Sequence, residues 1–286
     1  MFQIGDMRIH MINDSINWVD PGGPFGLVPR TLWSPHMPPN DELLIPMIYN
    51  CLLVQSGGQN IIVDTGNGDK LSEKQRKFIH MERPTGSLID GLARLGLTPQ
   101  DIHLVIDTHL HGDHAGGNTR LDENGSIVPT FPNAEYVVQR REYEDAMHPN
   151  ERTRATYILD NYHPLYQTGQ LRLLEGDTEI RPGITGHITR GHTPAHMSIR
   201  FESNGHHALF VCDMASYAIH FERLGWMTSY DVEPLETLES KRRWQKWALE
   251  TNALLIFCHD MHRPAGYYRL GEDGKAAVHP VSEPFA

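Results

Sequence analysis

The sequence contains no apolar segment long enough to cross a bilayer. A membrane-spanning helix needs about 18 or more consecutive apolar residues, and no run in the 286-residue chain approaches that length. The opening residues, MFQIGDMRIHMIND, have neither a basic segment nor an apolar core. We therefore expect no signal peptide and no membrane partner.

Cysteine and positive charge are also scarce. Cys51, Cys212 and Cys258 are odd in number and lie far apart in apolar contexts, which predicts reduced, buried thiols and a cytoplasmic protein. Lysine and arginine total 25 against 36 aspartates and glutamates, a formal net charge of −11. Because nucleic-acid surfaces need clustered positive charge, this balance argues against a nucleic-acid partner.

The remaining composition, 39% hydrophobic and 21% charged, is that of a globular protein. No segment is a convincing linker, so we predict one domain over 1–286, with a core at 43–262 and a loop-rich arm at 13–42. Six prolines and three glycines fall within 19–40, where a loop could face a substrate or simply cover the surface. The aromatic stretch at 18–36 could also pack on a second subunit, as in a homodimer.

Hydrophobic periodicity predicts alternating strands and helices. Two strands within 43–66 join at Gly57-Gly58, a hairpin signal, and HLVID is a short buried strand. AGGN at 115–118 should open a helix, and GYYRL should form an edge strand. We expect further strands at 7–12, 135–139, 171–174, 184–189, 197–202, 207–212 and 253–258, and helices at 86–95, 140–147, 151–160 and 234–250.

The stretch DTHLHGDHAGG at 107–117 concentrates side chains that bind metals. His109 and His111 lie two residues apart, so they point the same way in an extended segment. Asp113 and His114 follow a glycine that lets the chain turn. A catalytic zinc keeps one coordination position for water, so four ligands exceed the need of one metal. The spacing predicts two metals that share this loop.

Further candidate ligands stand where later predicted strands end. Each alone is unremarkable, because a single histidine after a strand is more often structural. Together with the first motif, they could supply the remaining nitrogen and oxygen ligands that two metals need. These candidates are His192, His196, Asp213, His259 and Asp260. Such a set suits zinc, and manganese, iron or cobalt would also fit.

These motifs resemble those of the metallo-β-lactamase-fold superfamily of metallohydrolases. The matches, in order, are VDTG (63–66), THLHGDHAGG (108–117), GHTPAH (191–196), Asp213 and His259. The resemblance implies an α+β fold, a four-layer αβ/βα sandwich of two mixed sheets flanked by helices, with the site at one edge.

The resemblance also implies a set of ligands for each of two divalent metal ions. One metal would be held by His109, His111 and His192, and the other by Asp113, His114 and His259. Asp213 and a hydroxide would bridge them. His196 and Asp260 are expected outside the ligand set. Asp64 would orient a ligand from behind, or else is a turn aspartate before Gly66.

The implied chemistry is attack by the metal-bridging hydroxide on a lactone or ester. Asp113 or Asp213 would move the proton. Lactonases of this superfamily place a tyrosine three residues after the bridging aspartate, where this chain has Ser216. Tyr217, one residue later, either donates a hydrogen bond to the substrate oxygen or belongs to the core.

The C-terminal third narrows the substrate class. Its YD-x-x-P element at 230–234 and the HD pair at 259–260 resemble those of quorum-quenching lactonases, which favours an N-acyl homoserine lactone. Organophosphate and aryl-ester hydrolases share these elements, and glyoxalase II-type thioesterases share GHT-x-x-H. An acyl groove could use apolar side chains that could equally be core residues: Trp18, Phe25, Trp33, Met214 and Trp226.

A binding protein that kept the metals but lost the activity is the alternative from another class. The full set of candidate ligands argues for the enzyme.

Overall fold

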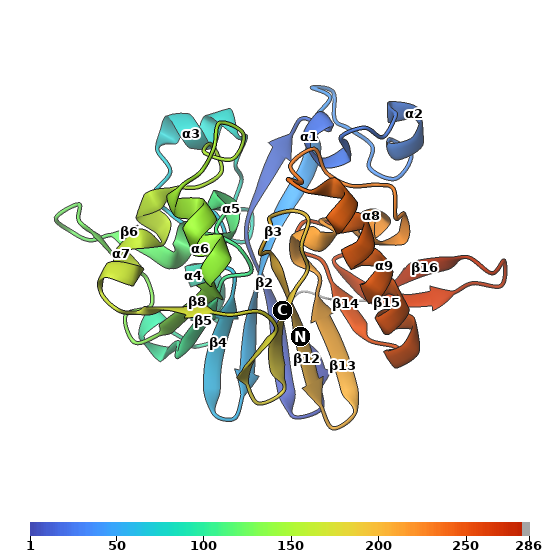
Figure 1. Cartoon of the computed structure of the whole chain (residues 1–286). Helices are drawn as coiled ribbons and strands as arrows, with labels where there is room; N and C mark the ends of the chain where they lie inside the picture. Colours follow the sequence, from blue (N-terminus) through green and yellow to red (C-terminus); the bar gives the residue numbers. More distant parts are fainter. Residues whose placement is uncertain (282–286) are drawn as a thin grey trace.

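Two seven-stranded sheets form the centre of the computed structural model, which describes residues 1–281 (Figure 1). The first sheet has the order β1 (Phe2–Ile4), β2 (Met7–Val19), β3 (Ile45–Ser56), β4 (Gln59–Val63), β5 (Leu104–Ile106), β8 (Glu135–Gln139) and β9 (Leu171–Leu174). The second has the order β10 (Thr178–Arg181), β11 (Ile184–Ile188), β12 (Met197–Ser203), β13 (His206–Phe210), β14 (Leu254–Ile256), β15 (Ala265–Leu270) and β16 (Ala276–Pro280). A small hairpin, β6 (Thr119–Leu121) and β7 (Ile127–Pro129), lies apart from both.

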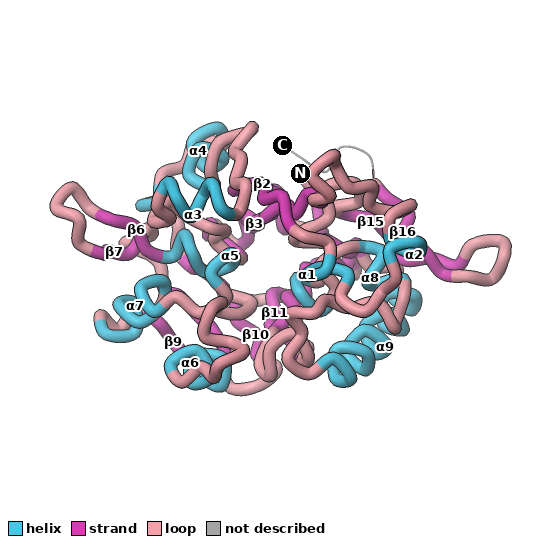
Figure 2. The backbone as a smooth tube through the Cα atoms, turned by 90° about the horizontal axis from the view of Figure 1, so that it is seen from above, coloured by secondary structure: helices cyan, strands magenta, loops and turns pink. Residues whose placement is uncertain are grey.

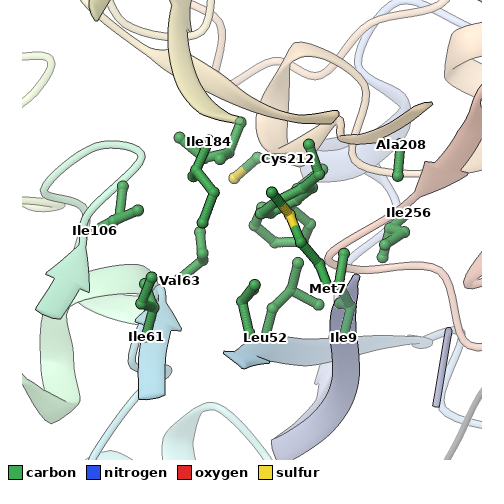
Figure 3. Packing of buried hydrophobic residues seen from close by; sticks show 14 of the residues in the cluster. Met7, Ile9, Leu52, Ile61, Val63, Ile106, Ile184, Ala208, Cys212 and Ile256 are labelled. Atoms are coloured by element: carbon green, nitrogen blue, oxygen red, sulfur yellow. The ribbon is translucent and has the colours of Figure 1, made fainter. Parts of the chain in front are cut away.

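Three apolar layers hold the sheets and helices together. Branched side chains from both sheets meet at the centre, among them Val63 and Ile106 from the first sheet and Ile184 and Ile256 from the second (Figure 3). Outside the first sheet lie α4 (Leu88–Arg94), α6 (Arg140–Met147) and α7 (His163–Gln167). Outside the second lie α8 (Ala218–Glu222) and α9 (Pro234–Thr251). The predicted four-layer αβ/βα sandwich is thereby confirmed.

Strand direction gathers several chain ends at one edge. β4, β5 and β8 are parallel neighbours in the first sheet, and β13 and β14 are parallel in the second. Because parallel strands end at the same edge of a sheet, the segments that follow β4, β5, β13 and β14 emerge together. Figure 2 views this end of the molecule, with the short helices α1 (Gly22–Phe25), α3 (Glu73–Phe78) and α5 (Gly112–Ala115) around it.

Most of the expected elements are present. The β3–β4 hairpin turns at Gly57 and Gly58, which both have positive φ (56° and 77°), as a two-residue hairpin turn requires. α6 spans 140–147 and α9 begins at Pro234, as the sequence predicts. In the described residues, no helix has the length and apolar character of a membrane span.

The N-terminal prediction was wrong in extent. The strand expected at 7–12 continues to Val19, because a register shift between Asn13 and Ser15 lets β2 pair with β3 along its whole length. The loop-rich arm therefore starts after residue 19 rather than at 13. It contains two short helices, α1 and α2 (Arg30–Trp33). The single-domain assignment stays a prediction.

Three local predictions were also wrong. Residues 151–160 form turns and the start of a 3₁₀ helix, because the Asn150 side chain caps the backbone N–H groups of Arg152 and Thr153 in place of helical bonds. AGGN does not open an α-helix: Ala115 ends α5, which starts at Gly112, and Gly116–Asn118 form a short 3₁₀ helix. GYYRL lies in β15, which is not an edge strand, because β16 pairs with it.

Glycines let two backbone segments of the site pack against each other. A Cβ on Gly116 would lie 2.3 Å from the Asn67 carbonyl oxygen and 2.7 Å from that of Gly66. Gly66 also forms a β-bridge with Ala115. The loop after β4 and the loop after β5 therefore touch through backbone atoms, which no rotamer change can relieve.

We predict that Gly116→Ala lowers the free energy of unfolding by about 1–3 kcal/mol, the usual cost of overpacking. Gly225→Ala is the matched control, because a Cβ there has no neighbour within 4 Å and the residue has no positive φ. Urea denaturation of both variants and the parent protein checks this. Equal midpoints for the two variants would contradict the backbone contact.

Candidate metal centre

The seven predicted ligands converge at the edge where the strands end. His109 and His111 follow β5, and Asp113 and His114 lie on α5. The others follow β11, β13 and β14: His192, Asp213 and His259. All are buried except Asp113, whose side chain is 28% exposed.

The first group consists of His109, His111 and His192, whose donor atoms all lie within 4.8 Å of one another. His192 Nε2 is 3.1 Å from His111 Nδ1, and also 3.3 Å from Asp213 Oδ2. Three imidazole nitrogens thus face one small volume beside a carboxylate, an arrangement that suits a divalent metal with a position left for water.

The second group consists of Asp113, His114 and His259, again within 4.8 Å. His114 Nε2 lies 3.1 Å from Asp213 Oδ2, and His259 Nε2 lies 3.1 Å from Asp213 Oδ1. The Asp213 carboxylate therefore stands between the two groups, with histidines of the second group near both of its oxygens.

Buried nitrogens without hydrogen-bond partners test whether metals fit here. The Nε2 atoms of His109, His114 and His259 are buried and have no hydrogen-bond partner within residues 1–281. They lie 3.1–3.6 Å from Asp213 oxygens without the alignment of a hydrogen bond. Leaving such atoms unpaired costs about 1–3 kcal/mol each, and two bound cations, one in each group, would satisfy all three. The donor set fits two divalent metal ions.

In three of the histidines, the ring nitrogen that faces away from the centre has a partner outside the cluster. His114 Nδ1 lies 2.9 Å from Asp64 Oδ2, and His192 Nδ1 lies 3.0 Å from Asp231 Oδ1. His259 Nδ1 donates to the Ile48 carbonyl at 2.8 Å. A hydrogen bond at Nδ1 fixes the tautomer and leaves the Nε2 lone pair facing the centre. Of the two interpretations of Asp64, this contact supports the orienting one.

Burial and mutual charge set the protonation of the cluster. Burial, reinforced by neighbouring imidazoles, lowers the pKa of His109 and of His111 well below the usual value, so both rings stay neutral. Burial opposes the charge of Asp213, but the imidazoles of His259, His192 and His114 outweigh it and hold its pKa well below the usual range. Burial also opposes the charge of His114 and of His192, but neighbouring acidic groups outweigh it and raise the pKa of both rings. Metal binding at these two rings would therefore displace protons.

Two supporting carboxylates were missed from the sequence as functional residues. Asp231 entered only as part of the YD-x-x-P element, yet it accepts from Thr228 and Thr237 besides holding His192. Glu142 lies on α6 and is fully buried, which raises its pKa. It accepts hydrogen bonds from the backbone of Leu110 and the hydroxyl of Thr193, and so ties together the loops after β5 and β11. In the sequence, Glu142 is one polar residue of a predicted helix, and no neighbouring residue indicates that it contacts these loops.

Two other motif residues support the site without facing it as ligands. His196 accepts the backbone N–H of Asp213 on Nε2, while its Nδ1 lies 2.8 Å from the Thr189 hydroxyl. Burial and the neighbouring His192 lower the pKa of His196 to about 3, so the ring is neutral. Asp260 accepts backbone N–H groups of Ala218 and Arg263. Both contacts agree with the expectation that these residues lie outside the ligand set.

The structure places Tyr217 inside an apolar cluster. Its ring stacks on Phe25 at 5.9 Å between centroids, and Trp33 of the same cluster also stacks on Phe25. The Tyr217 side chain is fully buried, and its hydroxyl lies 3.5 Å from the Pro46 carbonyl, longer than a firm O–H···O bond. The aromatic residues of the arm, Phe25 and Trp33, are therefore core residues that pack the arm onto α8, and not an exposed groove.

Comparison with known proteins agrees with this architecture. A family model described as the metallo-beta-lactamase superfamily matches residues 44–244. An N-acyl homoserine lactonase of Bacillus sp is 29% identical over 232 residues, covering 76% of this chain and 82% of the relative. One from Bacillus cereus is 26% identical, covering 84% and 91%.

Solved structures extend the match to almost the whole chain. A probable metal-dependent hydrolase from Staphylococcus aureus has a TM-score of 0.86 at 32% identity, covering 98% of this chain and 99% of that one. The dizinc quorum-quenching lactonase AidC, solved with a product, has a TM-score of 0.78 at 19% identity, covering 98% and 96%. The latter likeness concerns the fold alone.

The sandwich, the histidine-rich loop and the match over most of the chain define a metallohydrolase of the αβ/βα class. The chain belongs to the metallo-β-lactamase superfamily, which confirms the resemblance inferred from its motifs.

We predict that Asp231→Asn weakens divalent-metal binding about 10- to 100-fold, because the partner that fixes His192 is lost. Asp177→Asn is the matched control: Asp177 holds Nδ1 of His187, a histidine that belongs to neither donor group, at 2.8 Å. Chelator competition measures the affinity of each variant. Equal affinities would show that Asp231 does not position His192.

Proposed function

We propose that this protein is a dinuclear metal-dependent hydrolase that opens the ring of an N-acyl homoserine lactone. The observation that carries the proposal is the position of the Asp213 carboxylate between the two donor groups, with unpartnered imidazole nitrogens facing it. Lactonases among the relatives, at up to 29% identity, support the ester-hydrolase chemistry and the substrate class.

The proposed ligands divide as the two donor groups do. His109, His111 and His192 hold one metal, Asp113, His114 and His259 hold the other, and Asp213 is shared. When bound, two divalent cations bring the pKa of coordinated water toward neutrality and polarise the substrate carbonyl. Zinc is the proposed metal, since the set contains only imidazole and carboxylate donors.

We propose that Asp113 and Asp213 take part in proton transfer. Water oxygen bonds to the lactone carbonyl carbon, the ring C–O bond then breaks, and the released alkoxide takes a proton. Asp113 is the one ligand with solvent exposure, so its carboxylate can pass a proton between water and the leaving oxygen. Asp213 keeps its charge at neutral pH because three imidazoles hold its pKa down.

Supporting residues would keep this geometry rigid. Asp64, Asp231 and the Ile48 carbonyl each fix one imidazole through Nδ1. We also propose a cytoplasmic location, on the basis of three buried free thiols. A homodimer through the arm stays a proposal.

We predict that His109→Ala abolishes lactone turnover, with a loss greater than about 100-fold, because even outer partners of metal ligands contribute 10- to 100-fold. Proton release from a long-chain N-acyl homoserine lactone, with metal-loaded protein, measures this. His206→Ala is the control, since His206 is exposed on β13.

Absence of turnover in protein shown to hold two metals would overturn the lactone assignment. Aryl esters, phosphotriesters and thioesters, the substrates of the alternative hydrolases, would then be assayed with the same variants.

Tyr217 is proposed to donate a hydrogen bond to the substrate oxygen, which requires its hydroxyl to turn out of the apolar cluster that buries it. Tyr217→Phe should then lower kcat by roughly 100-fold, as loss of one oxyanion donor does, with little change in melting temperature. Steady-state kinetics and thermal melts check both. An unchanged kcat would leave Tyr217 as a core residue only.

A further inference from the structure

A separate cavity lies outside the candidate metal centre. It has a volume of about 580 Å³, within the size range of small-molecule sites. Its walls come from β2, β3, α4 and the segment after His259, and none of the seven proposed ligands lines it. Figure 2 shows α4 beside β2 on the side of the molecule opposite α6 and α9.

The lining is apolar with one charge. Met11, Ile16, Ile48, Leu95 and Met261 form most of the walls. Arg94 is the only charged residue among the lining residues of the described chain. A largely apolar cavity with a single cation at its wall matches a molecule with a hydrocarbon body and one negative charge.

The guanidinium of Arg94 is available to such a ligand. Arg94 Nη1 donates to the Thr85 carbonyl at 2.8 Å, which fixes the side chain across the cavity wall. Within residues 1–281, Arg94 has no carboxylate within ion-pair distance. Its Nη2 lies 3.5 Å from the place that a Cβ on Gly91 would occupy, so the side chain lies back along α4 over this small residue.

We propose that this cavity binds a single-chain anionic amphiphile, with the hydrocarbon chain among the β2 and β3 side chains and the anionic head at Arg94. The proposal does not depend on the lactonase assignment. The cavity is nevertheless connected to the metal centre through its wall. Ile48 lines the cavity and its carbonyl holds His259, and Met261 lies two residues after His259.

Methionine methyl groups provide a positional test. Met11 and Met261 line the cavity, whereas Met214 is buried in the apolar layer between the second sheet and its helices. We would label the methionine methyl groups with ¹³C in the full-length, metal-loaded protein and titrate decanoate below its micelle concentration. Decyltrimethylammonium, with the same chain length and the opposite charge, is the matched ligand.

Decanoate is expected to shift the Met11 and Met261 resonances while Met214 stays in place, and decyltrimethylammonium is expected to bind at least about tenfold more weakly. Arg94→Gln should weaken decanoate about fivefold, the upper effect of an exposed ion pair. Arg141→Gln, a change of the same kind on exposed α6, should have no effect. Thr85→Trp, which fills the cavity from its exposed rim, should abolish the shifts in a protein with unchanged circular dichroism.

Shifts confined to Met214, which does not line the cavity, would place decanoate elsewhere and overturn the proposal. Shifts at Met81, which lies by a different, charged hollow beside α3, would overturn it as well. So would equal binding of the two amphiphiles, or undiminished binding to Arg94→Gln.

Discussion

The Asp213 carboxylate lies within 3.6 Å of imidazole nitrogens from four histidines, and the rest of the site is arranged around this contact. A buried carboxylate is stable only when it is paired or binds a metal. Here the chain surrounds Asp213 with imidazoles, and the positive charge that His114 and His192 can carry stabilises the carboxylate. The low dielectric that makes isolated charge costly also makes cation binding at this point strong.

The sandwich makes that convergence possible. The ligands come from loops after strands of both sheets, so neither sheet alone could bring them together. Parallel pairing of β4 with β5 and of β13 with β14 delivers Asp64, Asp213 and His259 to the same edge. The backbone contact at Gly116 then fixes the position of the histidine-rich segment 107–117 relative to the loop after β4. Glu142 holds the loop after β5 and Asp231 holds the loop after β11, and neither residue is a proposed metal ligand.

The ligand motifs and most strands could be predicted because their signals are local. Two-residue spacing in THLHGDH, the Gly57-Gly58 turn and the periodicity of α9 each involve neighbouring residues. What escaped prediction depends on partners far away in the chain. β2 continues to Val19 only because β3 is there to pair with it, β15 is internal only because β16 covers it, and Asp231 is functional only through a contact 39 residues away. Tyr217 belongs to a cluster with Phe25, which no local pattern indicates.

Anomalous X-ray diffraction from crystals of the metal-loaded protein tests the central claim most directly. The account predicts two anomalous peaks, one on each side of the Asp213 carboxylate, the first among His109, His111 and His192 and the second among Asp113, His114 and His259. A single peak, or peaks that Asp213 does not touch, would contradict it.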